Sequence, residues 1–298
     1  MTFTVGVIGL GSMGGGMARS CLRAGLAVYG HDTVPERVAA FCAEGGAEGD
    51  LTAAAPGFDA AVLVVLNAAQ VEAVLFGEPG IVAHLRQGAV VLCCATVPPH
   101  FAVAMAERCQ QAGVHYLDAP ISGGAVKAGT GALTIMASGT AEAFAAAAPV
   151  LDATAESVFT LGDRAGPGSA MKAVNQLLAG VHIAAMAEAV TFGMTQGIQP
   201  AQFLEVISKC AGTSWMLENR APHIVAGDYT PHSQVQIWLK DLGIVLDAAQ
   251  TAGFDAPIAS TAMERFQSAV AMGFGQEDDA AVAKAYARQA GLTLPGAE

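Results

Sequence analysis

The feature that most constrains this chain is a glycine-rich turn near its beginning. The pattern G-x-G-x-x-G spans residues 9–14. An apolar run at 3–8 precedes it and predicts a strand, and the residues up to about 24 predict a helix. A strand, a glycine turn and a helix in this order open a βαβ unit, so the sequence indicates a doubly wound α/β domain.

The glycines of this turn have separate roles in binding a dinucleotide. Gly9 permits the tight turn, Gly11 lets the backbone approach a pyrophosphate, and Gly14 lets the helix pack closely on the strand. Free N–H groups at the helix start then face the anion. A glycine turn without a ligand is the alternative. We expect the pyrophosphate to be bound along the whole turn, by Gly9, Leu10, Gly11, Ser12, Met13 and Gly14.

Asp32 follows the next expected strand, at 26–31, and selects between two cofactors. A carboxylate at this position accepts hydrogen bonds from the adenosine ribose hydroxyls and repels a 2′-phosphate. We therefore expect NAD rather than NADP. The alternative is a solvated turn aspartate before Pro35.

Strand-like runs and helical stretches alternate through the first half of the chain. Further strands are expected at 60–66, 89–94 and 114–117, and two more at 133–137 and 157–160 close the sheet. This alternation predicts a mostly parallel, doubly wound sheet.

The pattern changes near residue 163, after which no strand is expected. Residues 169–196 predict one long helix, with Ser169 as a possible N-cap and Gly197 as the C′ glycine. We expect an α/β domain at 1–163 and an all-helical domain at 164–298. The further helices are expected at 200–209, 214–225, 233–252, 257–272 and 278–289.

Composition excludes several classes of protein. The chain has 298 residues, 53% of them apolar and 13% charged, so it is not disordered. Its net charge of −12 argues against nucleic acid or an anionic membrane surface as a partner. No apolar run approaches the roughly 20 residues of a membrane span, and no secretory signal is evident, so we expect a cytoplasmic protein.

The six cysteines and seven histidines show no metal-binding or redox spacing. The cysteines are expected to be reduced and mostly buried, and no metal is expected. Cys93, Cys94 and His182 are interpreted as core residues. Trp215 and Trp238 are interpreted as packing anchors.

The segment D-A-P-I-S-G-G, residues 118–124, follows an expected strand. Ligands bind outside the carboxyl ends of strands in doubly wound sheets. Ser122, Gly123 and Gly124 offer a hydroxyl and unobstructed N–H groups to a substrate carboxylate. A simple surface turn is an equal alternative on spacing alone.

Lys172, Asn175 and Gln176 share one face of the long helix. The positive end of the helix dipole, desolvation and the nicotinamide ring of NAD⁺ all disfavour a charged lysine at 172. Lys172 is therefore a candidate general base for alcohol oxidation, with a solvated lysine as the alternative. Lys240 is a second candidate cation for the site, or it solvates a helix end.

These segments together resemble the β-hydroxyacid dehydrogenases, the 3-hydroxyisobutyrate dehydrogenase superfamily. The resemblance covers almost the whole chain and rests on residues 5–14, 118–124, 166–172 (G-P-G-S-A-M-K) and 240–242 (K-D-L). It implies a Rossmann domain, a long interdomain helix, an all-α domain for substrate binding and oligomerisation, and a homodimer or homotetramer.

The resemblance also implies residue roles. Lys172 is implied to be the catalytic acid/base, and Ser122 and Gly123 are implied to bind the substrate carboxylate. Lys240 is implied to line the cofactor and substrate cleft. The cofactor contacts implied at the strand ends are Leu66, Asn67 and Thr96.

Two positions depart from the family pattern: Gln176 replaces an Asn, and Leu66-Asn67 replaces Leu-Pro. A longer amide at 176 displaces its polar atoms by about one methylene, which indicates a substrate other than simple 3-hydroxyisobutyrate. Residues 176–185 resemble a subgroup that has the same Gln and acts on a polyhydroxylated acid. Asn175, Gln176 and Asn219 offer polar partners to such a substrate.

We therefore expect NAD-dependent oxidation of a small hydroxy acid. One alternative is another family enzyme, acting on 3-hydroxyisobutyrate, tartronate semialdehyde or succinic semialdehyde. A second is a non-catalytic NAD-binding scaffold, against which the intact Lys172 counts. A third, an NADPH-dependent imine reductase, predicts no lysine at 172 and a basic residue near 32, and neither feature is seen.

Overall fold

The computed structural model describes residues 2–296 of the chain. These residues form two compact units that divide between Lys172 and Ala173, within the long helix α8 (Pro167–Thr195). Each unit has its own hydrophobic core and is described by itself.

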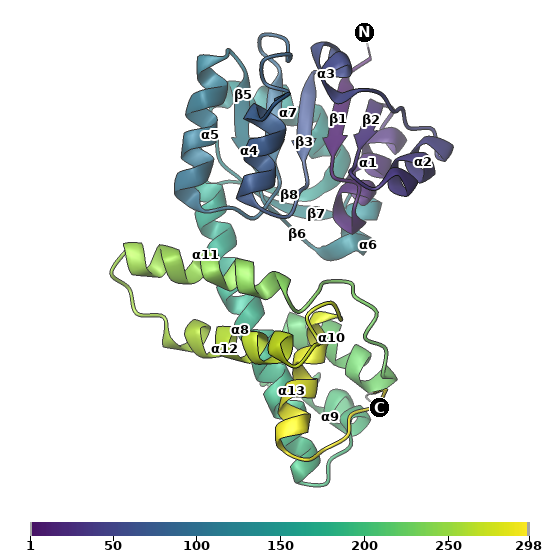
Figure 1. Ribbon diagram of the computed structural model, residues 1–298, viewed down its shortest axis with the longest axis vertical. Coiled ribbons are helices and arrows are strands. Elements are labelled where there is room, and N and C mark those ends of the chain that lie inside the picture. Colours follow the sequence, from purple (N-terminus) through teal and green to yellow (C-terminus); the bar gives the residue numbers. More distant parts are fainter. Residues whose placement is uncertain (1, 297–298) are drawn as a thin grey trace. The chain divides into compact units, whose positions relative to one another are not determined.

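The first unit is built on a five-stranded parallel sheet with the order β2-β1-β3-β4-β5 (Figure 1). Strand order reverses between β1 and β3, and in open α/β sheets ligands bind at the carboxyl ends of strands at such a point. The strands are β1 (Thr4–Ile8), β2 (Ala27–His31), β3 (Ala60–Leu63), β4 (Val90–Cys93) and β5 (His115–Asp118).

Helices cover both faces of this sheet, which explains its wholly apolar central strands. Alternate residues of β3 enter different cores: Val62 packs with the core around α1 and α7, and Leu63 with the core around α4 and α5. The bounds are α1 (Ser12–Arg23), α4 (Ala68–Phe76), α5 (Pro99–Gln111) and α7 (Ala141–Thr154). Shorter helices, α2 (Pro35–Ala43), α3 (Leu51–Ala54) and η1 (Ala55–Gly57), connect β2 to β3.

The expected closure of the sheet by residues 133–137 and 157–160 is wrong. These residues lie in a separate three-stranded sheet of order β6-β7-β8. Both edges of β7 are occupied, by antiparallel β6 and parallel β8, so β7 does not extend the larger sheet. The elements are β6 (Ile121–Ser122), α6 (Gly124–Thr130), β7 (Leu133–Ala137) and β8 (Ala155–Thr160).

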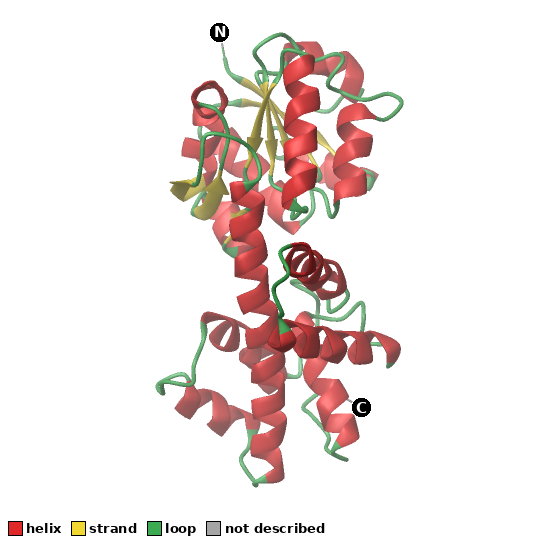
Figure 2. Cartoon of the chain, turned by 90° about the vertical axis from the view of Figure 1, so that its left-hand side faces the viewer, coloured by secondary structure: helices red, strands yellow, loops and turns green. Residues whose placement is uncertain are grey.

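The described residues from 173 to 296 contain helices and no named strand, as Figure 2 shows. Trp238 is buried in their core and stacks on Phe266, whereas Trp215 is 58% exposed and is not the packing anchor expected. The helices after α8 are α9 (Pro200–Ile207), α10 (Trp215–Ala226), α11 (Ile237–Thr251), α12 (Pro257–Ala271), η2 (Asp279–Ala281) and α13 (Val282–Gln289).

The starts of α8 and α11 differ from the sequence prediction. Helix α8 begins at Pro167, so Ser169 lies in its first turn instead of capping it. Proline suits this position because the first N–H groups of a helix have no intrahelical partner. Helix α11 begins only at Ile237, because the backbone N–H groups of Val235 and Gln236 donate to carbonyls at 277 and 275.

Helix α8 is long and apolar enough, by length and composition, to cross a membrane. The sequence analysis did not expect such a helix, because no uninterrupted apolar run reaches that length. In the second unit, its residues Ile183, Met186 and Val190 are buried in the core. A buried core helix can have the same length and composition as a membrane span.

Candidate active site

The glycine turn lies between β1 and α1, at the point where strand order reverses. Gly9 has φ +94°, and a Cβ there would lie 2.4 Å from the carbonyl oxygen of Val64. A Cβ on Gly14 would lie 1.8 Å from the carbonyl oxygen of Gly9. These two glycines are required by the fold itself.

Gly11 differs from these two because a Cβ there would meet no protein atom within 4 Å. It is the N-cap of α1 and has no side-chain cap hydrogen bond. The first N–H groups of the helix, at Ser12 and Met13, have no intrahelical acceptor. The open space and the oriented donors therefore fit the pyrophosphate of a dinucleotide.

Asp32, which follows β2, forms a hydrogen bond with the glycine turn. Its Oδ2 accepts a hydrogen bond from the N–H of Leu10 at 2.7 Å, and its Oδ1 accepts one from Val34 at 2.9 Å. Arg37 lies 3.3 Å from Oδ1. The inference that no basic residue lies near position 32 is therefore wrong, because α2 returns Arg37 to the carboxylate.

The ends of β3 and β4 carry the other predicted cofactor contacts. The strand expected over 60–66 ends at Leu63. Leu66 therefore lies beyond the strand, and it is 62% exposed. Asn67 caps α4 by accepting a hydrogen bond from the N–H of Gln70. Thr96 is half-buried three residues beyond β4. The roles of these residues toward a cofactor stay predictions.

The Ser-Gly-Gly loop follows β5 and contains two consecutive glycines in the left-handed region. Gly123 has φ +133° and Gly124 has φ +76°. Side chains with a Cβ rarely adopt such angles, so this backbone path depends on glycine. Ser122 ends β6 and is half-buried beside these glycines.

The buried carboxylate of Asp118 joins the end of β5 to the start of α8. Its Oδ1 accepts a hydrogen bond from Ser169 Oγ at 2.6 Å. Its Oδ2 accepts from the N–H groups of Gly166 and Ser169 at 3.0 and 2.8 Å, and from Ser138 Oγ at 3.3 Å. Burial raises the pKa of Asp118, and the hydrogen bonds from Ser169 oppose that rise.

Lys172 lies one turn into α8, beyond this carboxylate. Its side chain is buried, with 8% of the residue exposed, and its Nζ donates to the carbonyl oxygen of Ile121 at 2.9 Å. Ile121 is the neighbour of Ser122. The structure thus brings the predicted base to the predicted carboxylate loop, and the solvated alternative for Lys172 is wrong.

The second unit holds the other polar residues of the prediction in one hydrogen-bonded chain. Asn175 Nδ2 donates to Gln176 Oε1, and Gln176 Nε2 donates to Asp241 Oδ2. Lys240 forms an ion pair with the other carboxylate oxygen of Asp241. The remaining predicted partner, Asn219, accepts a hydrogen bond from Arg220 instead.

Asp118, Ser169 and Asp241 organise these groups, whereas the sequence analysis gave no role to either aspartate and proposed Ser169 only as a helix cap. Asp118 and Asp241 lie within the motifs at 118–124 and 240–242, which gave only a weak indication of their roles. The residues that they contact, Ser169 and Gln176, lie 51 and 65 positions away in the sequence. Cys93 and Cys94 are buried, as predicted, and burial raises the pKa of Cys93 to about 11.

Comparison with known proteins gives matches along the chain. The model of the NAD-binding domain of 6-phosphogluconate dehydrogenase matches residues 4–162. The model described as NAD-binding of NADP-dependent 3-hydroxyisobutyrate dehydrogenase matches residues 166–286.

Individual relatives match over nearly their whole length. The chain is 48% identical to an L-threonate dehydrogenase of Escherichia coli O6:H1, covering 99% of this chain and 98% of that protein. It is 47% identical to one of Cupriavidus necator, covering 99% of both. The crystal structure of a 3-hydroxyisobutyrate dehydrogenase from Salmonella typhimurium is 48% identical with a TM-score of 0.91, covering 95% of this chain and 99% of that one.

Proposed function

The chain belongs to the β-hydroxyacid dehydrogenase family of NAD-dependent oxidoreductases, and from this premise we propose that it oxidises L-threonate to 2-dehydro-L-erythronate. The single observation that carries the proposal is the position of Lys172. A buried amine whose Nζ lies 2.9 Å from the carbonyl oxygen of Ile121 adjoins the loop assigned to the substrate carboxylate.

The residues of the chain divide the reaction between binding and proton transfer. Ser122, Gly123 and Gly124 hold the carboxylate through the hydroxyl and backbone N–H groups. Lys172 accepts the hydroxyl proton at Nζ. NAD, which the glycine turn would hold when it is bound, would supply the acceptor for the hydride. Asp118 fixes the first turn of α8 and thereby the position from which Lys172 acts.

Two features support L-threonate as the substrate. Relatives at 46–48% identity carry that activity in their names. Asp241 also fixes the amide of Gln176, which in turn accepts a hydrogen bond from Asn175. An oriented amide pair favours a substrate with several hydroxyl groups over one with a methyl branch. We assign Lys240 to the same site, held by Asp241.

A substrate panel tests this assignment. Initial rates with NAD would be measured for L-threonate, D-threonate and 3-hydroxyisobutyrate, and with NADH for tartronate and succinic semialdehydes. We expect the highest kcat/KM for L-threonate. A higher value for another compound would replace the substrate, and no NADH formation with any hydroxy acid would favour a non-catalytic scaffold.

We further propose that Asp32 excludes the 2′-phosphate of NADP, even though Arg37 lies beside it. Arg37 is already paired with this carboxylate, so its charge is offset while Asp32 is present. Replacing Asp32 by Asn should release Arg37 to a phosphate and raise the ratio of NADP to NAD turnover. The double variant Asp32→Asn/Arg37→Ala should lose that gain. An unchanged ratio in Asp32→Asn would contradict this role.

We also propose that the chain acts as a homo-oligomer in the cytoplasm. Large apolar side chains lie exposed along α8, with Val174 57%, Leu178 50% and Phe192 65% exposed. Exposed large apolar side chains on one helix indicate an interface, and a second copy would cover them. Light scattering should show a dimer or tetramer, reduced to a smaller species by Leu178→Glu but not by Val206→Glu on α9.

Finally, we assign residues 1–163 to cofactor binding and 164–298 to substrate binding and oligomerisation. The two matched family models meet between residues 162 and 166, which supports a division there. Lys172 would then belong to the helical domain by sequence, while its described contact is with Ile121 of the first unit.

A further inference from the structure

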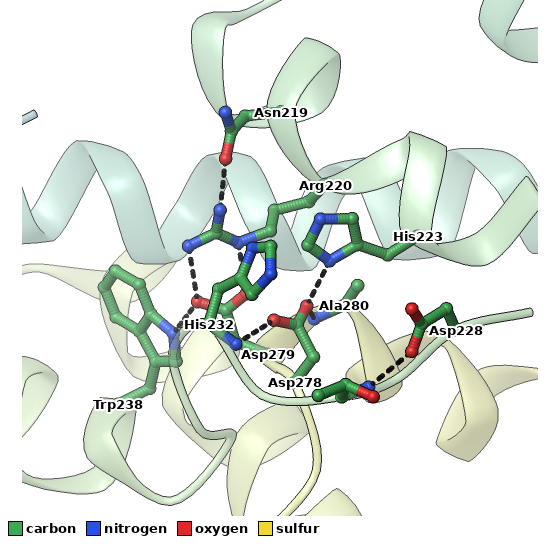
Figure 3. Close-up of polar contacts among 10 residues, drawn as sticks. Asn219, Arg220, His223, Asp228, His232, Trp238, Asp278, Asp279 and Ala280 are labelled. Carbon is green, nitrogen blue, oxygen red and sulfur yellow. Dashed lines mark hydrogen bonds and ion pairs between the residues drawn. The ribbon is translucent and has the colours of Figure 1, made fainter. Parts of the chain in front are cut away.

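Three side chains with metal-binding atoms come together in the second unit. His223 lies on α10, His232 lies in the loop before α11, and Asp278 directly precedes η2 (Figure 3). One ligand atom of each residue lies within 4.8 Å of the other two. The histidines lie 55 and 46 residues from Asp278, so the sequence contained no short spacing that indicated the cluster.

Backbone donors fix the carboxylate of this cluster. Asp278 is fully buried, and its Oδ2 accepts a hydrogen bond from the N–H of His232 at 3.0 Å. Its Oδ1 accepts one from the N–H of Ala280 at 3.1 Å and lies 2.8 Å from Nδ1 of His223. Each carboxylate oxygen has lone pairs beyond those used by the backbone. Asp278 is therefore held in place and retains capacity to bind a cation.

The two imidazole rings also face the same region. Their centroids are 4.9 Å apart and their planes are nearly perpendicular, at 85°. His223 is largely covered, whereas His232 is exposed. An ion can therefore enter from the side of His232, with water completing its coordination.

The charge around the cluster favours a cation. Asp279, next to Asp278, is also fully buried, and Asp228 lies in the loop that leads to His232. Against these three carboxylates stands the guanidinium of Arg220, which pairs with Asp279. A divalent ion would balance the remaining negative charge.

We propose that His223, His232 and Asp278 form a binding site for a divalent transition-metal ion, with zinc as the representative ion. Two imidazoles and one carboxylate suit zinc, whereas calcium and magnesium prefer an all-oxygen site. The ion would connect α10, the loop before α11 and the segment before η2. By joining these three segments, a bound ion would stabilise the second unit.

The test uses the full chain after removal of metal with a chelator. Because exposed Cys210 is a competing zinc ligand, the Cys210→Ser variant serves as the parent. Zinc chloride would be titrated by calorimetry, and cobalt(II) would be added to record ligand-field absorption. We expect one ion per chain, a cobalt spectrum of nitrogen and oxygen ligation, and a higher Tm with zinc.

Single-residue variants distinguish this site from general surface binding. His232→Ala should weaken zinc binding by at least about tenfold and remove the rise in Tm. His84→Ala, which removes an exposed histidine of the first unit, should bind zinc as the parent does. His223→Ala provides a second variant, and circular dichroism checks that each is folded. Absence of saturable binding by the parent, or equal binding by folded His232→Ala, would overturn the proposal.

Discussion

The two units bury carboxylates with different kinds of partner. In the first unit, Asp118 is surrounded by neutral donors, the hydroxyl groups of Ser138 and Ser169 and two backbone N–H groups. In the second, Asp279 is paired with the guanidinium of Arg220 and also accepts from Trp238 Nε1. Burial raises the pKa of both carboxyl groups. The first network positions a backbone, and the second joins charged side chains of separate segments.

This difference separates effects on catalysis from effects on stability. The Asp118 network ends at the first turn of α8, directly before Lys172, so its loss should disturb the position of the base. The Asp279 network lies among α10, α11 and η2, so its loss should destabilise the second unit. Four predictions follow from this contrast, beginning with the largest effect.

The first prediction concerns Lys172 itself. Lys172→Ala should lower kcat by about three orders of magnitude, because no other group is assigned to accept the hydroxyl proton. Binding of NADH, measured by fluorescence titration, should persist. Lys209→Ala, an exposed lysine in the second unit, provides the matched control. Retained turnover in Lys172→Ala would remove this residue from its role.

The second prediction concerns the charged network. Asp279→Asn should lower the free energy of unfolding by about 3–5 kcal/mol, because it leaves a mostly buried Arg220 without its counter-charge. Urea unfolding monitored by tryptophan fluorescence measures this loss. Exposed Asp247→Asn should change stability by less than about 0.5 kcal/mol. A similarly small change in Asp279→Asn would show that the ion pair makes no net contribution to the free energy of unfolding.

The third prediction concerns the neutral network. Asp118→Asn turns an amide N–H₂ toward the donors of Gly166 and Ser169, so the start of α8 should shift. We expect kcat to fall by about 10²-fold with little change in the KM for NAD. The exposed Asp152→Asn variant in α7 should leave kcat unchanged. If Asp118→Asn lowered Tm without lowering kcat, the network would be structural only.

The fourth prediction concerns the thiols, which also differ between the units. Burial raises the pKa of Cys21 and Cys109 to about 12 and that of Cys93 to about 11, and it raises that of Cys94 well above its usual value. Cys210, in the second unit, is exposed. Iodoacetamide at pH 8 should therefore label Cys210 first, as peptide mass spectrometry can measure. Early labelling of Cys93 or Cys94 would show that the first unit opens locally.

Local sequence patterns predicted some parts of this molecule and not others. The glycine turn and the helical position of Lys172 depend on residues close together in the chain, and both were predicted. The burial of Lys172 depends on Ile121, 51 residues earlier, and spacing alone left it open. The separate sheet of β6, β7 and β8 was missed because strand periodicity does not specify which edges pair.

The polar partners were hardest to predict for the same reason. Gln176 was noticed as an unusual residue, but its partner Asp241 lies 65 positions away. Arg37 is only five residues from Asp32, yet its proximity was overlooked because it depends on how α2 turns back. Motifs thus identified the chemical groups, and tertiary packing determined which of them are oriented.

The central claim, that Lys172 is the base for a carboxylate held at residues 122–124, is tested most directly by a crystal structure with NADH and L-threonate. We predict that Nζ of Lys172 lies about 3 Å from the hydroxyl oxygen that is oxidised, with the carboxylate on Ser122 and its glycines. A structure with Nζ turned to solvent, or with the carboxylate bound elsewhere, would contradict the claim.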